Sequence, residues 1–86
     1  MTRAEILSRL TAILVAEFEL APETIREQAR LVEDLDLDSI DGVSIVVRVE
    51  AQLGIVLSDD EISAMTTVGD VVDALQARLE EGAAPA

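Results

Sequence analysis

The segment 34–42, with the sequence DLDLDSIDG, holds the residues of this chain that are best suited to chemistry. It places four aspartates around a single hydroxyl group, that of Ser39. Three kinds of site have this composition: a calcium-binding loop, an acidic helix cap, and a serine that receives a modification. The choice among them decides most of what the sequence predicts about function.

A calcium-binding loop of the EF-hand type fails in both possible registers. Such a loop needs oxygen ligands at its positions 1, 3 and 5, glycine at 6 and a bidentate glutamate at 12. With Asp34 as the first position, Ile45 stands at the twelfth; with Asp36 as the first, Val47 stands there. We therefore predict no specific metal site, and only loose cation binding by the crowded carboxylates.

A helix start explains two of the aspartates. Asp38 is a good N-cap, and Asp41 lies three residues further on, where an acidic side chain can bond back to the cap and complement the helix dipole. This interpretation accounts for both carboxylates. It leaves unexplained why a serine, Ser39, stands at the tip of the predicted helix.

The rest of the chain offers little material for catalysis. Its 86 residues, enough for one small domain, include no His, Cys, Lys, Tyr or Trp, and Phe18 is the only aromatic residue. An imidazole base, a thiolate and a Schiff-base lysine are therefore excluded. We predict that the chain is not an enzyme and has no catalytic residues of its own.

The net charge of −12 also limits the partners. A polyanion repels nucleic-acid phosphates and anionic lipid, and it attracts basic protein surfaces. No targeting segment and no apolar run of membrane-spanning length is visible. We expect a cytoplasmic monomer that binds proteins, without nucleic-acid binding or membrane insertion.

The same charge predicts a response to pH. Eighteen carboxylates face only six arginines, so their mutual repulsion is expected to raise the folded pKa values on average. Asp34 and Glu61 are among the expected contributors. Mild acid should then stabilise the fold, because it relieves the repulsion.

Four helical segments are predicted to position the acidic loop. Apolar periodicity and local capping patterns predict long helices at about 3–18, at 39–53 and after Thr67, and a short one at 59–64. The Val- and Ile-rich second segment has the propensity of a strand, but the Asp38 cap and a glycine stop favour a helix. The expected fold is all-α: a small bundle of three main helices plus one short helix. We predict a domain over residues 1–80 and a flexible tail over 81–86.

Residues 19–38 are predicted to form a long ordered loop, with a helical turn near 23–26. Only Ile25, Leu31 and Val32 are expected to anchor it to the core. A loop of this length in a small domain is more often functional than not.

The predicted middle helix has too many apolar residues for one face. One arc is expected to face the core: Ile45, Val46, Val49 and Leu53. A second arc, rotated away from the first, consists of Ile40, Val43 and Val47. An exposed apolar strip rimmed by charge is typical of a partner surface, so we expect the second arc to face partner proteins.

In this motif and in its order of elements, the chain resembles the acyl carrier proteins of fatty acid and polyketide synthesis. Asp38-Ser39-Ile40 is similar to the family's Asp-Ser-Leu attachment motif, and the resemblance covers about residues 4–79. It implies that a phosphopantetheinyl transferase attaches 4′-phosphopantetheine covalently to Ser39, and that the arm carries acyl groups as thioesters. It also implies acyl-loading, ketosynthase-type condensing and acyl-transferring enzymes as partners.

The resemblance places partner recognition on the middle helix. The candidate recognition residues are Asp38, Ile40, Asp41, Val43, Ser44, Val47, Arg48 and Glu50. This helix is less acidic than is usual in the family, and Gly42 should cost about 1 kcal/mol against alanine. Arg48 is expected either to tune partner choice or simply to pair with Asp41 or Gln52. A dedicated polyketide or other specialised carrier is therefore as consistent with the sequence as a fatty acid carrier.

Two alternatives stay open. One is an aminoacyl, peptidyl or D-alanyl carrier, although peptidyl carriers usually have glycines before the serine, where this chain has Asp36 and Leu37. The other is an acidic protein-interaction module of the same fold that is never modified.

Overall fold

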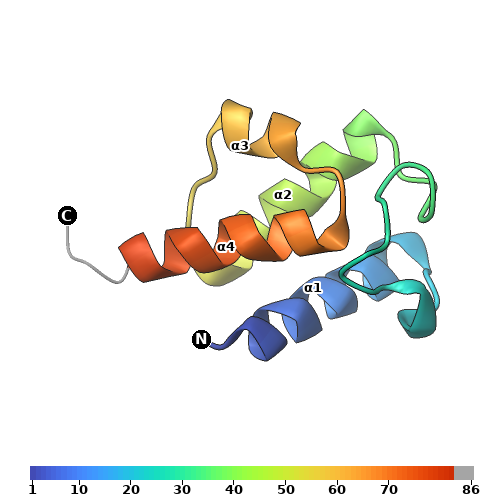
Figure 1. Cartoon of the computed structure of the whole chain (residues 1–86), viewed down its shortest axis with the longest axis horizontal. Helices are drawn as coiled ribbons and strands as arrows, with labels where there is room; N and C mark the ends of the chain where they lie inside the picture. The colour runs from blue at the N-terminus through green and yellow to red at the C-terminus, as the bar shows by residue number, and fades with distance from the viewer. Residues whose placement is uncertain (83–86) are drawn as a thin grey trace.

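The computed structural model describes residues 1–82 and shows helices wrapped around an aliphatic core (Figure 1). Their order is α1 (Arg3–Phe18), a 3-10 turn (Pro22–Thr24), α2 (Ser39–Leu53), α3 (Asp59–Ala64) and α4 (Val68–Gly82). This confirms the predicted bundle of three long helices and one short one. Helix α4 continues past the predicted domain boundary at residue 80, and residues 83–86 of the predicted tail lie outside the described residues.

The helices begin where local capping patterns predict. At the start of α2, the N–H of Asp41 donates to Asp38 Oδ1 at 2.8 Å, and the N–H of Asp38 donates to Asp41 Oδ2 at 3.2 Å. The helix ends at Gly54, whose φ of 67° is favoured by glycine. The other caps pair Thr2 with Glu5, Ser58 with Glu61, and Thr67 with Asp70.

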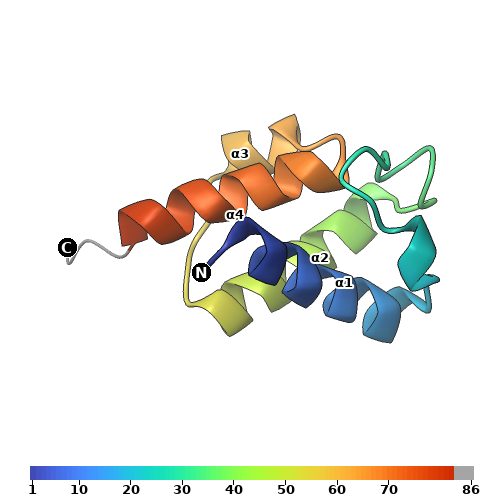
Figure 2. The same cartoon turned by 60° about the horizontal axis from the view of Figure 1, so that its bottom comes forward.

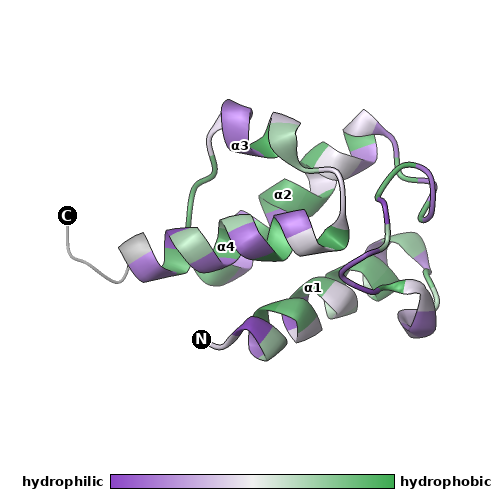
Figure 3. Cartoon of the chain, in the orientation of Figure 1, coloured by the Kyte–Doolittle hydropathy of each residue, from purple (hydrophilic) through white to green (hydrophobic). Residues whose placement is uncertain are grey.

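The core is built from the apolar faces of the three long helices. Helix α1 packs against both α4 and α2, and α3 lies on the far side of α2 and α4 from α1 (Figures 1 and 2). Hydrophobic faces turn inward, and hydrophilic ones lie on the outside (Figure 3). The most deeply buried side chains are Ile6, Leu10, Leu14, Val49, Val68, Val72 and Leu75. Burial of each stabilises the fold by about 1.5–3 kcal/mol.

The long loop between α1 and α2 is fixed by backbone bonds to the beginning of α4. The N–H of Val68 donates to Ala29 O, and the N–H of Gly69 donates to Glu27 O, both at 2.9 Å. A Cβ at Gly69 would lie 3.0 Å from Glu27 O, so this close approach depends on a glycine. Arg3 bonds to Glu27 at 2.5 Å and adds a link to α1. The loop therefore delivers the acidic segment to one defined place.

The anchors of this loop differ in part from those predicted. Ile25 is buried as expected, but Val32 is 61 % exposed, so its assignment to the core is wrong. Leu35 and Leu37 are buried instead, at 4 % exposure each. These two leucines are held by turn bonds, since the N–H of Leu35 donates to Arg30 O and the N–H of Leu37 donates to Leu31 O. Asp36 between them is left-handed and exposed, so helical or strand periodicity could not predict which residues of this segment are buried.

The expectation of raised carboxylate pKa values is wrong for several groups. The guanidinium of Arg78 bonds to Glu61 and lowers the pKa of that carboxyl to about 2. The backbone N–H of Arg30 lowers the pKa of Asp34, and that of Thr66 lowers the pKa of Asp70. Direct hydrogen bonds outweigh the general repulsion at these sites.

Glu61→Gln is therefore expected to lower the melting temperature at neutral pH. The folded pKa of Glu61 lies below its ordinary value of 4.5, so its contribution to stability is complete above that value and is lost as the pH falls toward about 2. Thermal melts across this range should show the difference between the variant and wild type shrinking in acid.

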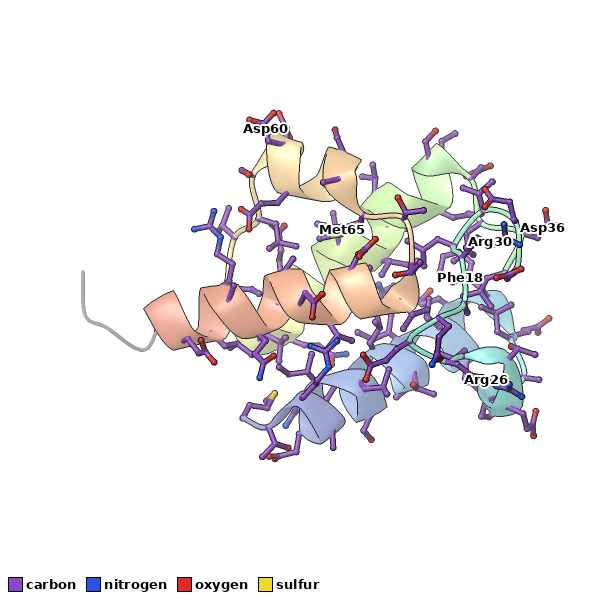
Figure 4. All side chains as sticks on the ribbon, viewed as in Figure 1. Phe18, Arg26, Arg30, Asp36, Asp60 and Met65 are labelled. Carbon is purple, nitrogen blue, oxygen red and sulfur yellow. The ribbon has the colours of Figure 1, made fainter. Side chains whose placement is uncertain are left out.

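Asp60→Asn is the matched control for this prediction. Asp60 shares the first turn of α3 with Glu61, but it points into solvent away from the bundle (Figure 4). Both changes remove one charge from the same helix start, but only Glu61 bonds to Arg78 and also accepts the N–H of Ser58. Equal losses in the two variants at neutral pH would contradict a role for the ion pair.

Candidate functional site

The acidic segment leads into α2 along the surface. Asp34 Oδ2 accepts the N–H of Arg30 at 2.8 Å, which closes a turn before the segment extends. Asp36 adopts a left-handed conformation with φ of 57°, which aspartate tolerates better than most residues. Figure 4 shows Arg30 and Asp36 together on the loop beside the start of α2. The buried side chains of Leu35 and Leu37, on either side of Asp36, anchor this segment to the core.

Ser39 is the first residue of α2 and is exposed. Asp38 caps the helix, and the Ser39 hydroxyl makes no hydrogen bond within residues 1–82. The backbone N–H groups of Ser39 and Ile40 also have no acceptor there, as expected at a helix start. A phosphate at this hydroxyl would meet the positive end of the helix dipole, although the carboxylates of Asp38 and Asp41 reduce that potential.

An apolar cavity of about 360 Å³ opens beside Ser39. Its opening is marked by lining residues that are themselves exposed: Val32, Asp38, Ser39, Val43 and Ser63. Its interior is formed by aliphatic side chains from every helix and from the α2–α3 connection: Leu10, Leu14, Val46, Val49, Leu57, Ile62, Val71 and Leu75. No polar or charged residue is buried in the described part of the chain, so the polar groups of the cavity lie at its rim.

The two apolar arcs of α2 separate as predicted. Ile45, Val46 and Val49 are buried, whereas Ile40 is 74 % exposed and Val43 and Val47 are each 56 % exposed. The exposure of the second arc is thus confirmed. Its role in partner binding stays a prediction.

Two of the candidate recognition residues on α2 make contacts that the sequence does not indicate. Arg48 pairs with Glu17 of α1 at 3.1 Å, so the expected partners, Asp41 and Gln52, are wrong. Glu50 Oε2 accepts the N–H of Leu57 at 2.8 Å and so holds the connection to α3. Arg48 remains exposed beside its ion pair, whereas the Glu50 carboxylate is engaged internally.

The sequence interpretation missed several residues that line the cavity, namely Val32, Ile62, Ser63 and Met65. Three of them lie in or just after the short helix α3, whose position over α2 no local pattern predicts. Val32 was assigned to the core because it is aliphatic, although its acidic neighbours in the sequence indicate an exposed segment. Exposure and contact with a cavity together identify it as a rim residue.

Comparisons with known proteins agree with this geometry. The family model described as the phosphopantetheine attachment site matches residues 8–75. Acyl carrier protein 2 of Ralstonia nicotianae is 38 % identical over 92 % of this chain and 98 % of the relative. The chain belongs to the acyl carrier protein family.

Two further comparisons extend this result. The meromycolate extension acyl carrier protein of Mycobacterium leprae is 35 % identical over 94 % of this chain and 70 % of its own length. The crystal structure of the acyl carrier protein from Thermotoga maritima superposes with a TM-score of 0.83 at 29 % identity and covers 92 % of each chain. Acyl carrier proteins are carriers and not enzymes.

The residues at the start of α2 fit the group that acyl carrier proteins hold, covalently attached 4′-phosphopantetheine. An exposed hydroxyl without a hydrogen bond, unpaired N–H groups and an adjoining apolar cavity are what a phosphodiester-linked acyl arm requires. Among residues 1–82, no three acidic or other ligating side chains gather as a metal site would demand. No helix in the same range is long and apolar enough to cross a bilayer.

Proposed function

We propose that Ser39 is the single attachment site of 4′-phosphopantetheine, and that the chain carries acyl groups as thioesters whose alkyl part enters the adjoining cavity. The observation that carries this proposal is the exposed, unbonded Ser39 hydroxyl at the mouth of an apolar cavity of about 360 Å³. When attached, the group supplies a terminal thiol for the acyl cargo. The chain supplies the attachment point, the apolar cavity that encloses the alkyl part, and the surface that partner enzymes recognise.

The attachment reaction needs nothing from this chain beyond the serine. The Ser39 Oγ forms a bond to the pantetheine-side phosphorus of coenzyme A, and the bond from that phosphorus to the other phosphate breaks. The adenosine bisphosphate half leaves, and the hydroxyl proton passes to a base on the transferase. This chain has no histidine or lysine, and we assign that base to the partner enzyme.

The cavity lining favours an alkyl cargo over a polyketide. Each methylene that leaves water for an apolar interior contributes about 0.8 kcal/mol. A keto or hydroxyl group in the same place would lose its hydrogen bonds to water without gaining a partner. A relative named for meromycolate extension supports the same assignment. We therefore place the chain in fatty acyl metabolism, with a polyketide pathway as the second candidate.

Loading with matched cargoes tests this assignment. The phosphopantetheinylated protein is charged with octanoyl, β-ketooctanoyl or aminoacyl groups, and each product is confirmed by intact mass. The octanoyl form should melt at a higher temperature than the uncharged form. The β-ketooctanoyl and aminoacyl forms should melt close to the uncharged form. A melting temperature raised as much by the keto or aminoacyl cargo would favour the polyketide or aminoacyl alternative.

The proposed partners are a phosphopantetheinyl transferase and the enzymes that load, condense and transfer acyl groups. We place their docking surface on the exposed strip of Ile40, Val43 and Val47, flanked by Asp38, Asp41, Ser44 and Arg48. The surface is acidic near Ser39 and carries a positive charge further along α2. The cytoplasmic location and the monomeric state stay predictions from the sequence.

Arg48→Glu is expected to change partner choice. The Arg48 guanidinium pairs with Glu17 but stays 61 % exposed, so its positive charge still faces an approaching enzyme. It repels a basic patch, and such a repulsion can discriminate between partners more strongly than it stabilises one. Turnover with basic-faced carrier-dependent enzymes should rise several-fold, and turnover with the cognate enzymes should fall. Arg9→Glu makes the same charge change on an exposed position of α1. Equal effects of the two variants would assign the change to net charge alone.

A further inference from the structure

Gly42 occupies a position where the fold does not need a glycine. It lies in the first turns of α2, where glycine is among the least favourable residues. Gly54 is the glycine with a positive φ in residues 1–82, and Gly69 is the one pressed against a neighbouring backbone. A Cβ built on Gly42 meets nothing within 4 Å. Neither strain nor a close approach therefore explains this residue.

The position of Gly42 relative to Ser39 suggests another reason. Residues three apart on a helix are neighbours on its surface, so Gly42 lies one turn beyond Ser39. Both line the cavity, together with the exposed Val43. The missing side chain leaves open space in the wall of the cavity, next to the hydroxyl that we assign as the attachment point.

We propose that Gly42 is a specificity-determining residue, which widens the mouth of the cavity so that acyl groups branched next to the carbonyl can enter. This proposal rests on the proposed function. The polar carbonyl end of an acyl group stays at the polar rim of Asp38, Ser39 and Ser63, while its alkyl end enters the apolar interior. With the arm folded back so that the thioester reaches this rim, a substituent on the carbon next to the carbonyl would lie at the part of the wall formed by Gly42, where a larger side chain would compete for the open space.

Matched acyl groups on matched variants test the proposal. Wild type, Gly42→Ala and Gly42→Leu are phosphopantetheinylated, charged with octanoyl or its α-methyl analogue, and checked by intact mass. Ala51→Leu is the control, because Ala51 is an exposed small residue of α2 that does not line the cavity. The readouts are the rise in melting temperature on charging and the rate of spontaneous thioester hydrolysis.

We expect the Gly42 variants to lose protection of the branched thioester and to keep protection of the straight one. Wild type and Ala51→Leu should protect both acyl groups to the same degree. Gly42→Ala should protect octanoyl like wild type but hydrolyse the branched thioester several-fold faster, and Gly42→Leu should do so more strongly. Equal ratios of branched to straight hydrolysis in all variants would overturn the proposal. Failure of wild type to gain mass, or to protect octanoyl, would instead overturn the proposed function, and this proposal with it.

Discussion

Ser39→Ala is expected to abolish phosphopantetheinylation completely. After incubation with coenzyme A and a broad-specificity transferase, wild type should gain the mass of one phosphopantetheinyl unit, and the variant should gain none. The fold should be unaffected, because Asp38 caps α2 and the Ser39 hydroxyl makes no hydrogen bond within the described chain. We expect the free energy of unfolding to change by no more than about 0.5 kcal/mol, as for other exposed substitutions.

Ser8→Ala is the matched control for this experiment. Ser8 is also an exposed serine in a helix, but it lies in the interior of α1, away from a helix start and from the cavity. It should be modified like wild type. If Ser39→Ala still gained mass, the assignment of the site would be wrong. If wild type gained none with any transferase, the chain would be the unmodified interaction module that the sequence leaves open.

Val49→Ala should destabilise the protein far more than Val43→Ala, although both shorten a valine of α2 by the same atoms. Val49 is 2 % exposed within the core, whereas Val43 is 56 % exposed at the rim of the cavity. Removing buried methyl groups loses their transfer free energy and leaves a void, so we expect Val49→Ala to lose on the order of 2 kcal/mol. That is a large share of the roughly 5–15 kcal/mol that stabilises a domain.

Val43→Ala should instead slow the reactions of partner enzymes with the carrier. We expect its free energy of unfolding to stay within about 1 kcal/mol of wild type. Attachment of phosphopantetheine or transfer of acyl groups should slow, because the strip of Ile40, Val43 and Val47 is proposed to contact partner enzymes. Urea denaturation and transferase kinetics on both variants measure the two effects. A strongly destabilised Val43→Ala with normal kinetics would show that the strip serves the fold.

Local patterns in the sequence determined the helices and the candidate serine. A helix cap is formed by residues three positions apart, so Asp38 with Asp41 marks the start of α2 without reference to the rest of the chain. The stop at Gly54 is equally local, since it needs only a residue that tolerates a positive φ. The position of Ser39 at the tip of α2 follows directly from these signals. The separation of α2 into a core arc and an exposed arc also follows, from helical periodicity.

Contacts between distant segments decided the rest. The place of the long loop depends on bonds from Gly69 and Val68 to residues some forty positions earlier, and the pairing of Arg48 with Glu17 depends on α1 meeting α2. Val32 was misassigned for the same reason, because burial in an irregular segment is set by whatever packs over it. The cavity beside Ser39 exists only where the helices and the α2–α3 connection converge. A sequence records which residues are apolar, but only the packing of the helices determines which of them enclose a space and which stand at its rim.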